Sequence, residues 1–216
     1  YNESGSSLDD RTVFSYDANG NRLSSTREYY NGTQWVGLYR YLYAYNNNDS
    51  IVEYTNETWN QGAWKANWRY LLTYNAPNGY MDTLFIQNYN GTTWLDGDRY
   101  TYTYTLQNNP ETILRESFLS GAWRYLYIDE YTYDANGDMI EIATKFASGM
   151  LDYSSTYEYD ANHNLTLYSY FDWTASGTVS TEKKRINLTY DAYNHTTSYT
   201  LSDYINGSLT QIRKEY

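Results

Sequence analysis

The chain has no cysteine, two histidines and only two prolines among its 216 residues. Without cysteine, neither a disulfide framework nor a thiolate metal site can form, although this absence does not fix the cellular compartment. The low proline content accompanies thirty tyrosines and seven tryptophans. Such a composition favours β-strands and contains few strong helix formers.

Basic charge and long apolar runs are also scarce. The 15 lysines and arginines are outnumbered by 26 acidic residues, which gives a net charge of −11. This charge argues against binding to nucleic acid or to anionic membrane surfaces. No apolar run approaches the roughly 18 residues of a membrane-spanning helix, and no signal peptide is visible. Because residue 1 lies in mid-repeat, the missing leader carries no information about export.

The pattern that is present is a repeat. Residues 123–138 read WRYLYIDEYTYDANGD, in which alternating aromatics lead into an Asp/Asn/Gly cluster. Alternation with period two is typical of a strand, and the cluster after it is typical of a turn. We call the last tyrosine before each such turn a register tyrosine, and the spacing of these tyrosines is typical of solenoids and other arrays. They are Tyr16, Tyr45, Tyr74, Tyr104, Tyr133, Tyr159, Tyr190 and Tyr216, at spacings of 29, 29, 30, 29, 26, 31 and 26 residues.

A second apolar pair lies between the register tyrosines. Residues 30–35 (YNGTQW) place two aromatics on either side of a short glycine loop. A loop of this kind predicts a hairpin whose flanking pair faces across the strands. The pattern recurs at residues 59–64, 89–94 and 118–123, at 146–151 and 204–209 with an aliphatic partner, and at 173–179 with one extra residue. The tryptophans that close the first four pairs are Trp35, Trp64, Trp94 and Trp123.

Each repeat is therefore expected to contain two strands and two turns. We predict an all-β fold of tandem β-hairpin repeats of about 29 residues, which form an extended antiparallel sheet or a superhelical β-solenoid. Since a single hairpin is marginally stable, stacking should align the register tyrosines and hairpin tryptophans into structural ladders. Residues 1–216 are expected to form a single repeat array with no separate domain. Both ends fall in mid-repeat, so the array is expected to be a fragment of a longer protein.

The turn motifs carry a family resemblance. Residues 16–23 (YDANGNRL), 133–139 (YDANGDM) and 159–166 (YDANHNLT) resemble the YD repeat of Rhs-type proteins. The whole repeat is more similar to the Trp/Tyr-rich repeats of secreted Bacteroidetes surface proteins, where runs such as residues 56–64 (NETWNQGAW) alternate with YD turns. Those proteins often carry a type IX secretion sorting domain, so the resemblance implies an exported array, extracellular or at the cell surface. The repeat is longer than a common Rhs repeat, and seven repeats are too few for a closed Rhs shell.

The sequence does not favour an enzyme. Catalysis needs a convergent set of titratable groups, whereas His163 and His195 both occupy turn positions where Asn or Gly would also serve. Carboxylate pairs such as Asp152 with Glu158 could perform glycoside acid–base chemistry. Acidic residues of an acidic chain are more typical of solvent-facing charge. We predict no catalytic residue and no enzymatic activity.

Three turns place oxygen-bearing side chains at alternate positions, as a calcium loop does. The strongest calcium candidate is the set Asp134, Asn136 and Asp138. Its loop lacks the glycine that an EF-hand has at position six, and tight turns also select Asp, Asn and Gly. No metal site is therefore assigned firmly, and calcium is the single cofactor candidate. By the family resemblance, Ser50 and Thr83 are candidate O-glycosylation sites, with unmodified surface hydroxyls as the alternative.

The leading functional hypothesis is a structural repeat segment of a secreted cell-surface stalk, fibre or adhesin. Its expected partners are neighbouring repeats of the same chain, further copies in filaments, and glycans, but not nucleic acid or a membrane interior. The first alternative is a glycan-binding module that uses exposed Trp and Tyr. The second is part of an Rhs-like shell that encloses a toxin. Aromatics exposed along one edge would favour glycan binding, and uniformly buried aromatics would favour the shaft.

Overall fold

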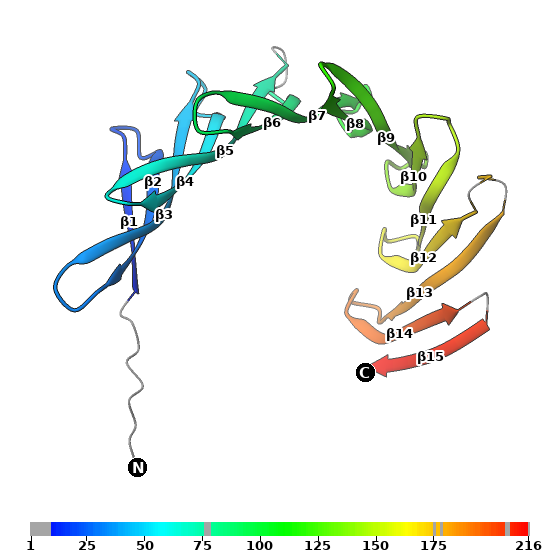
Figure 1. Ribbon diagram of the computed structural model, residues 1–216. Coiled ribbons are helices and arrows are strands. Elements are labelled where there is room, and N and C mark those ends of the chain that lie inside the picture. The colour runs from blue at the N-terminus through cyan, green and yellow to red at the C-terminus, as the bar shows by residue number, and fades with distance from the viewer. Residues whose placement is uncertain (1–9, 76–78, 175, 178, 206–207, 216) are drawn as a thin grey trace. The chain divides into compact units, whose positions relative to one another are not determined.

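The computed structural model describes residues 10–75, 79–174, 176–177, 179–205 and 208–215. These residues form fifteen strands and no helix (Figure 1). The strands make one open antiparallel sheet, in which they follow one another in the order of the sequence. The prediction of an all-β chain of tandem hairpins in an extended sheet is confirmed. The strands are β1 (Asp10–Tyr16), β2 (Arg22–Tyr30), β3 (Trp35–Tyr45), β4 (Ile51–Asn60), β5 (Ala63–Tyr74), β6 (Met81–Tyr89), β7 (Trp94–Tyr104), β8 (Pro110–Leu119), β9 (Ala122–Tyr133), β10 (Met139–Phe146), β11 (Leu151–Tyr159), β12 (Leu165–Trp173), β13 (Ser180–Tyr190), β14 (Thr196–Ile205) and β15 (Ser208–Glu215).

Each odd-numbered strand from β1 to β13 ends on a register tyrosine. The Asp/Asn-rich turn that follows leads into the next even-numbered strand, and the strand pairing shifts by one residue at the tyrosine. Such a shift is a β-bulge, which increases the local twist. The period of the sequence thus fixes where each turn begins. Register shifts of this kind occur at Tyr16, Tyr45, Tyr74, Tyr133, Tyr159 and Tyr190, and Tyr216 lies outside the described residues.

The chain divides into two compact parts, each of which is described by itself. The first contains the residues up to Tyr100 together with Ser117–Trp123. The second contains Thr101–Glu116 and the residues from Arg124 onward. The hairpin tryptophans at positions 35, 64, 94 and 123 therefore all belong to the first part. No helix within the described ranges offers an apolar stretch long enough to cross a membrane.

Very few side chains are fully buried. Among the described residues, Ala143 is the one buried apolar side chain, at 9% exposure. Since the strands form one sheet, the aromatic rings stay mostly half-buried and pack along a face and across to neighbouring strands. The remaining buried residues are small and polar: Thr55, Asn56, Thr144, Ser154, Ser155, Ser169 and Ser202.

Tyr54 on β4 is the centre of an aromatic cluster in the first part. Its ring centroid lies 5.2 Å from that of Tyr41 and 5.1 Å from that of Tyr43, both stacked, and 5.4 Å from Trp68, edge-on. Desolvation by burial, followed by the neighbouring phenols, raises the pKa of Tyr54 to about 12. Aromatic pairs of this geometry contribute about 0.5–1.5 kcal/mol each beyond the area they bury. Packing between aromatic rings on one face of the sheet therefore replaces part of an apolar core.

The glycine hairpins follow the predicted pairing in the first part. Tyr30 pairs with Trp35 and Trp59 pairs with Trp64, with ring centroids 5.4 and 5.1 Å apart. The rings flanking the loops at residues 90–93 and 119–122 lie 5.1 and 5.3 Å apart. The predicted cross-strand contact of each aromatic pair is confirmed at these four hairpins.

Two hairpins of the second part differ from the prediction by one residue. Leu151 pairs with Lys145 rather than with Phe146, because the backbone N–H of Phe146 donates to Met150 and closes a shorter loop. Trp173 pairs with Ser180, because the loop closes between residues 174 and 179. Tyr204 and Leu209 pair as predicted. Side-chain size alone therefore does not set the register when the loop can close on a backbone hydrogen bond.

Candidate functional site

The turns after the register tyrosines are built around one side-chain oxygen. Asp134 Oδ1 accepts hydrogen bonds from the backbone N–H groups of Asn136 and Asp138, each at 2.9 Å. Desolvation raises the pKa of Asp134, but the hydrogen bonds from Asp138, Asn136 and Gly137 together lower the pKa on balance. The equivalent oxygens of Asp17, Asn46, Asp160 and Asp191 accept the same pair of backbone hydrogen bonds.

The fourth position of these turns requires a left-handed backbone. Its φ is 59° at Asp49, 64° at His163 and 65° at Asn194, and glycine occupies it at residues 20 and 137. Asn and Asp tolerate this conformation better than other residues do, and glycine adopts it without steric cost. Turn geometry therefore accounts for the Asp/Asn/Gly pattern that a calcium loop would share.

The calcium candidate stays a prediction. Both oxygens of Asp134 already accept hydrogen bonds within the turn, since Asn136 Nδ2 donates to Oδ2 at 3.3 Å. Within the described part of the chain, no group of three or more His, Asp or Glu side chains is placed to hold a metal ion. Of the glycosylation candidates, Ser50 lies in a turn and Thr83 on β6, where its hydroxyl is 2.6 Å from that of Thr73. Their modification stays a prediction as well.

We expect the array to lose stability as the pH falls below 3.8, the ordinary aspartate pKa. The pKa of each turn aspartate is lowered in the folded state, so its contribution is complete above 3.8 and is lost as the pH falls through the folded pKa. Urea unfolding midpoints measured from about pH 5 to about pH 2 should report this loss. The four aspartates are Asp17, Asp134, Asp160 and Asp191.

The matched control replaces these four aspartates by asparagine. Asn46 already fills the position in one turn and accepts the same backbone hydrogen bonds without titrating. The asparagine variant should therefore keep the turns and show a shallower loss of stability with acid. Equal slopes for the two proteins would show that the turn carboxylates do not contribute.

Successive turns are joined by side-chain contacts. In the first part, Asn21 Nδ2 donates to Asp49 Oδ1 at 2.7 Å. In the second part, His163 Nδ1 lies 2.6 Å from Asp138 Oδ2, and Asn164 Nδ2 donates to Asn194 Oδ1 at 3.0 Å. The hydrogen bond with Asp138 raises the pKa of His163. Each contact joins the fifth position of one turn to the fourth position of the next.

The two histidines lie in different turns and each meets a turn aspartate. His163 contacts Asp138, and His195 Nδ1 lies 3.1 Å from Asp191 Oδ2. Both imidazoles are more than half exposed. The absence of enzymatic activity stays a prediction.

Five register tyrosines close the open end of their own glycine-loop hairpins. Their hydroxyls donate to the carbonyl of the first residue of the preceding even-numbered strand. Because the glycine loop joins these two strands, each bond lies within one repeat. The bonds run from Tyr45 to Arg22 at 3.0 Å, Tyr74 to Ile51 at 2.7 Å, Tyr133 to Pro110 at 2.8 Å, Tyr159 to Met139 at 3.0 Å and Tyr190 to Leu165 at 2.9 Å.

The hairpin tryptophans of the first part are each covered by an arginine. The guanidinium carbon of Arg40 lies 4.7 Å from the ring centroid of Trp64, and its Nε donates to Glu57 at 2.5 Å. Cation–π stacking of this kind contributes about 0.5–1 kcal/mol at exposed sites. The other stacked pairs are Arg11 with Trp35 at 4.3 Å, Arg69 with Trp94 at 4.5 Å and Arg99 with Trp123 at 4.5 Å.

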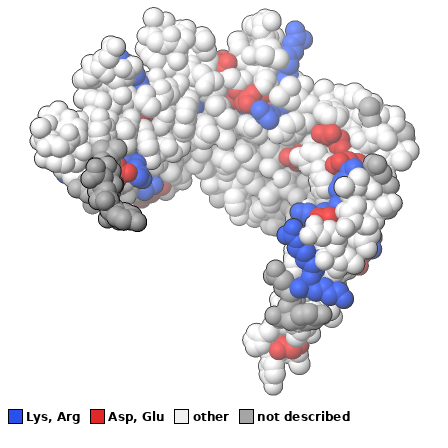
Figure 2. All heavy atoms as spheres, turned by 60° about the horizontal axis from the view of Figure 1, so that its bottom comes forward, with Lys and Arg blue, Asp and Glu red and all other residues white. Residues whose placement is uncertain are grey.

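The aromatic pattern did not predict this series of arginines. A recurrence at intervals of 29, 29 and 30 residues, similar to that of the tryptophans, was the sequence pattern that could have indicated it, at Arg11, Arg40, Arg69 and Arg99. The stacking makes the tryptophans part of the contact between repeats, where one face of each indole is covered. Most other side chains on the face drawn in Figure 2 are uncharged.

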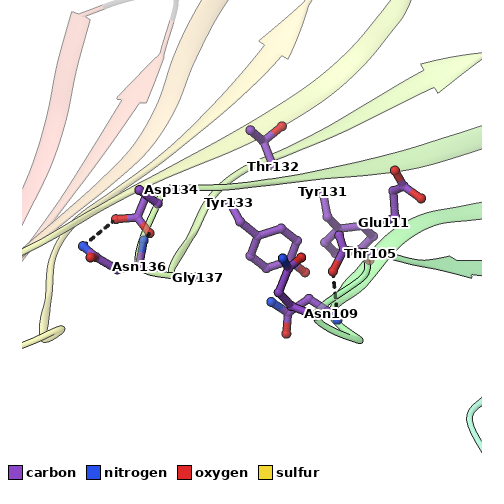
Figure 3. A pocket seen from close by; sticks show the side chains of 11 residues that line it. Thr105, Asn109, Glu111, Tyr131, Thr132, Tyr133, Asp134, Asn136 and Gly137 are labelled. Carbon is purple, nitrogen blue, oxygen red and sulfur yellow. Dashed lines mark hydrogen bonds between the residues drawn. The ribbon is translucent and has the colours of Figure 1, made fainter. Parts of the chain in front are cut away.

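A hollow of about 770 Å³ lies between two successive turns of the second part (Figure 3). Its lining includes the rings of Tyr131 and Tyr133 together with Thr105, Gln107, Asn109 and Glu111. A related hollow of about 660 Å³ occupies the equivalent place in the first part, where it is lined mainly by tyrosines of β3, β4 and β5. Hollows of this volume are in the range of small-ligand sites. The hollow of Figure 3 is the candidate functional site because polar and aromatic groups converge there.

The chain is similar to several solved structures at low sequence identity. No family model and no curated protein matches the sequence. Similar solved structures include a protein of unknown function from Bacteroides fragilis, 12% identical, with a TM-score of 0.46 over 57% of this chain and 93% of that one. A porin-like protein from Bacteroides uniformis is 13% identical, with a TM-score of 0.39 over 95% of this chain and 92% of that one.

A Tc toxin structure also matches. The Photorhabdus luminescens Tc holotoxin pore is 11% identical, with a TM-score of 0.42 over 90% of this chain and 13% of that one. The TM-scores of these three structures lie below 0.5, so function has to be inferred from the residues of this chain.

Proposed function

We propose that the chain is a structural repeat segment of a secreted cell-surface stalk, fibre or adhesin, in which the repeats supply length and stiffness. The observation that carries the proposal is that side-chain contacts join successive repeats along the open sheet, through the turns in both parts of the chain and through arginine–tryptophan stacks in the first part. Export to the cell surface by a type IX route belongs to the proposal and is supported by the resemblance of the repeats.

The physical argument is that no hairpin of this array is stable alone. An isolated hairpin is marginal in water, and these strands bury little apolar surface of their own. In such an array, stability is approximately the sum of repeat and interface contributions. The arginine–tryptophan stacks and the turn contacts act between neighbouring repeats, and the tyrosine bonds hold the two strands of each repeat together. This arrangement suits an element that transmits load along the chain.

The proposal is tested by changing the number of repeats. Deleting residues 46–74 removes one 29-residue period and joins Tyr45 to Asn75, so that a register tyrosine is again followed by asparagine. Duplicating the same residues adds one period. The longest dimension, measured by electron microscopy of negatively stained full chains, should shorten or lengthen by about 10 Å, which is two strand spacings.

A half-repeat deletion is the matched control. Removing residues 46–60 deletes a turn and β4 alone, which reverses the direction of every following strand and should abolish cooperative folding. A longest dimension that does not change with repeat number, or hollow closed particles, would overturn the structural proposal in favour of a shell.

A further inference from the structure

Three polar side chains in the hollow of Figure 3 have no partner within the protein. The amides of Gln107 and Asn109 and the carboxylate of Glu111 line it, and among the described residues none of these three groups makes a hydrogen bond or an ion pair. At the fifth position, which Asn109 occupies here, the side-chain amides of Asn21 and Asn164 in two other turns are engaged. Polar groups that converge on one hollow without partners are available to a ligand.

The sequence of the turn explains why these amides are free. Its first position is Thr105, where most other turns have aspartate or asparagine. The Thr105 hydroxyl accepts a hydrogen bond from the backbone N–H of Asn109 at 3.2 Å. The backbone N–H of Thr105 donates to the carbonyl of Asn109, and that of Asn108 donates to the carbonyl of Thr105, which closes the turn. The amides at positions three and five are therefore not needed to hold the turn.

Tyr131 and Tyr133 form the aromatic part of the hollow, and a hydrogen bond holds Tyr133 in place. The hydroxyl of Tyr133 is held by the carbonyl of Pro110 at 2.8 Å. Figure 3 shows the rings of Tyr131 and Tyr133 beside Thr105 and Asn109. Burial, followed by the Asp129 charge, raises the pKa of Tyr131 to about 12, so its phenol stays neutral near neutral pH. This aromatic part offers ring surface without a phenolate charge.

This combination matches the chemistry of a sugar ring. Each amide both donates and accepts, as a sugar hydroxyl does, and the C–H face of a pyranose packs against an aromatic face. The carboxylates of Glu111 and Asp134 give the hollow a negative potential, which disfavours anionic sugars. We propose that the hollow binds a neutral pyranose residue of a glycan. Gln107, Asn109 and Glu111 hold its hydroxyl groups, and Tyr131 and Tyr133 pack against the ring. This inference is independent of the structural role, which it would supplement with an adhesive contact.

The test is a titration of the full chain with maltohexaose, cellohexaose and mannohexaose, followed by the side-chain amide signals of Gln107 and Asn109 in ¹⁵N NMR spectra. At least one neutral probe should shift both signals with a Kd of about 1 mM, as expected for a shallow site. The double variant Gln107→Ala/Asn109→Ala should weaken binding at least about tenfold, as measured by calorimetry. Asn19→Ala removes an amide at the equivalent position of another turn and should leave binding unchanged.

Hexagalacturonic acid tests the predicted role of charge. It should not bind the wild-type chain, and Glu111→Gln, which keeps hydrogen bonding and removes one charge, should admit it. The inference is overturned if no neutral probe binds at about 10 mM. It is also overturned if binding survives the double variant, or if hexagalacturonic acid binds the wild type as well as a neutral probe does. Each outcome leaves the repeat-number experiment unaffected, so the two proposals can fail separately.

Discussion

Replacing Trp64 by alanine is expected to lower the free energy of unfolding of the first part by about 3 kcal/mol. The indole packs against Trp59 at 5.1 Å, lies beneath Arg40 at 4.7 Å and covers the backbone at Gly37. Its removal abolishes one aromatic pair and one cation–π stack and leaves a gap between neighbouring hairpins. Equilibrium unfolding in urea, followed by tryptophan fluorescence and circular dichroism, measures the loss.

A matched control separates packing from a general effect of substitution. Leu106 is 99% exposed at a turn, so Leu106→Ala should change the free energy of unfolding by less than about 0.5 kcal/mol. A Trp64→Ala midpoint no lower than that of Leu106→Ala would show that the stacked tryptophans do not stabilise the array.

A substitution at Gly37 tests the same packing of Trp64, because the indole lies against the backbone of Gly37. A Cβ placed there would lie 2.7 Å from Cζ2 and Cη2 of Trp64 and 3.3 Å from Cβ of Trp59. Alanine is normally more stable than glycine inside a strand, but Gly37→Ala should destabilise the chain by about 1–3 kcal/mol because the indole is held on both sides. In the Trp64→Ala background the same change should lose its cost.

The strands and turns were predictable because their signals are local. Alternating aromatics define β7 and β9, and the Asp/Asn/Gly cluster after Tyr133 follows from a turn whose fourth residue has positive φ. The pairing of Tyr30 with Trp35 across the hairpin also follows from the length of the loop. The one-residue offset in the pairing of Leu151 could not be predicted from loop length, because it depends on which backbone carbonyl closes the loop.

The long-range side-chain contacts were not predictable from local patterns. The stack of Arg11 on Trp35 joins residues 24 positions apart, and the bond from Tyr74 to Ile51 joins residues 23 apart. The stack depends on how one hairpin is placed beside the next, and the bond depends on how the two strands of one hairpin lie at its open end. The alternation within a strand specifies neither. The free polar groups in the hollow beside Tyr133 depend on Thr105, which stands where most other turns have aspartate or asparagine. The effect of Thr105 is apparent once the hydrogen-bond partners of the neighbouring side-chain amides are known.

Replacing Tyr74, Tyr159 and Tyr190 together by phenylalanine is expected to lower the free energy of unfolding by about 3 kcal/mol in total. Each substitution keeps the ring and removes one donor from a part-buried carbonyl. Each lost bond costs about 1 kcal/mol, and the sites are distant enough to add. Native-state hydrogen exchange locates the effect, since Tyr74→Phe should speed exchange of β4 amides and leave β12 unchanged.

Tyr45 and Tyr133 provide the comparison, because their hydroxyls donate to exposed carbonyls that water can satisfy after the substitution. Phenylalanine at these two positions should therefore cost less per site than at the part-buried ones. Alkali tests the same bonds without mutation. Burial raises the pKa of Tyr74 and Tyr159 above 10.0, so their contribution is complete below pH 10.0 and is lost as the pH rises through the folded pKa. If the hydroxyl bonds stabilise the hairpins, the triple phenylalanine variant starts from lower stability and loses less of it in alkali. Parallel alkaline profiles would mean that these hydroxyl bonds do not stabilise the hairpins.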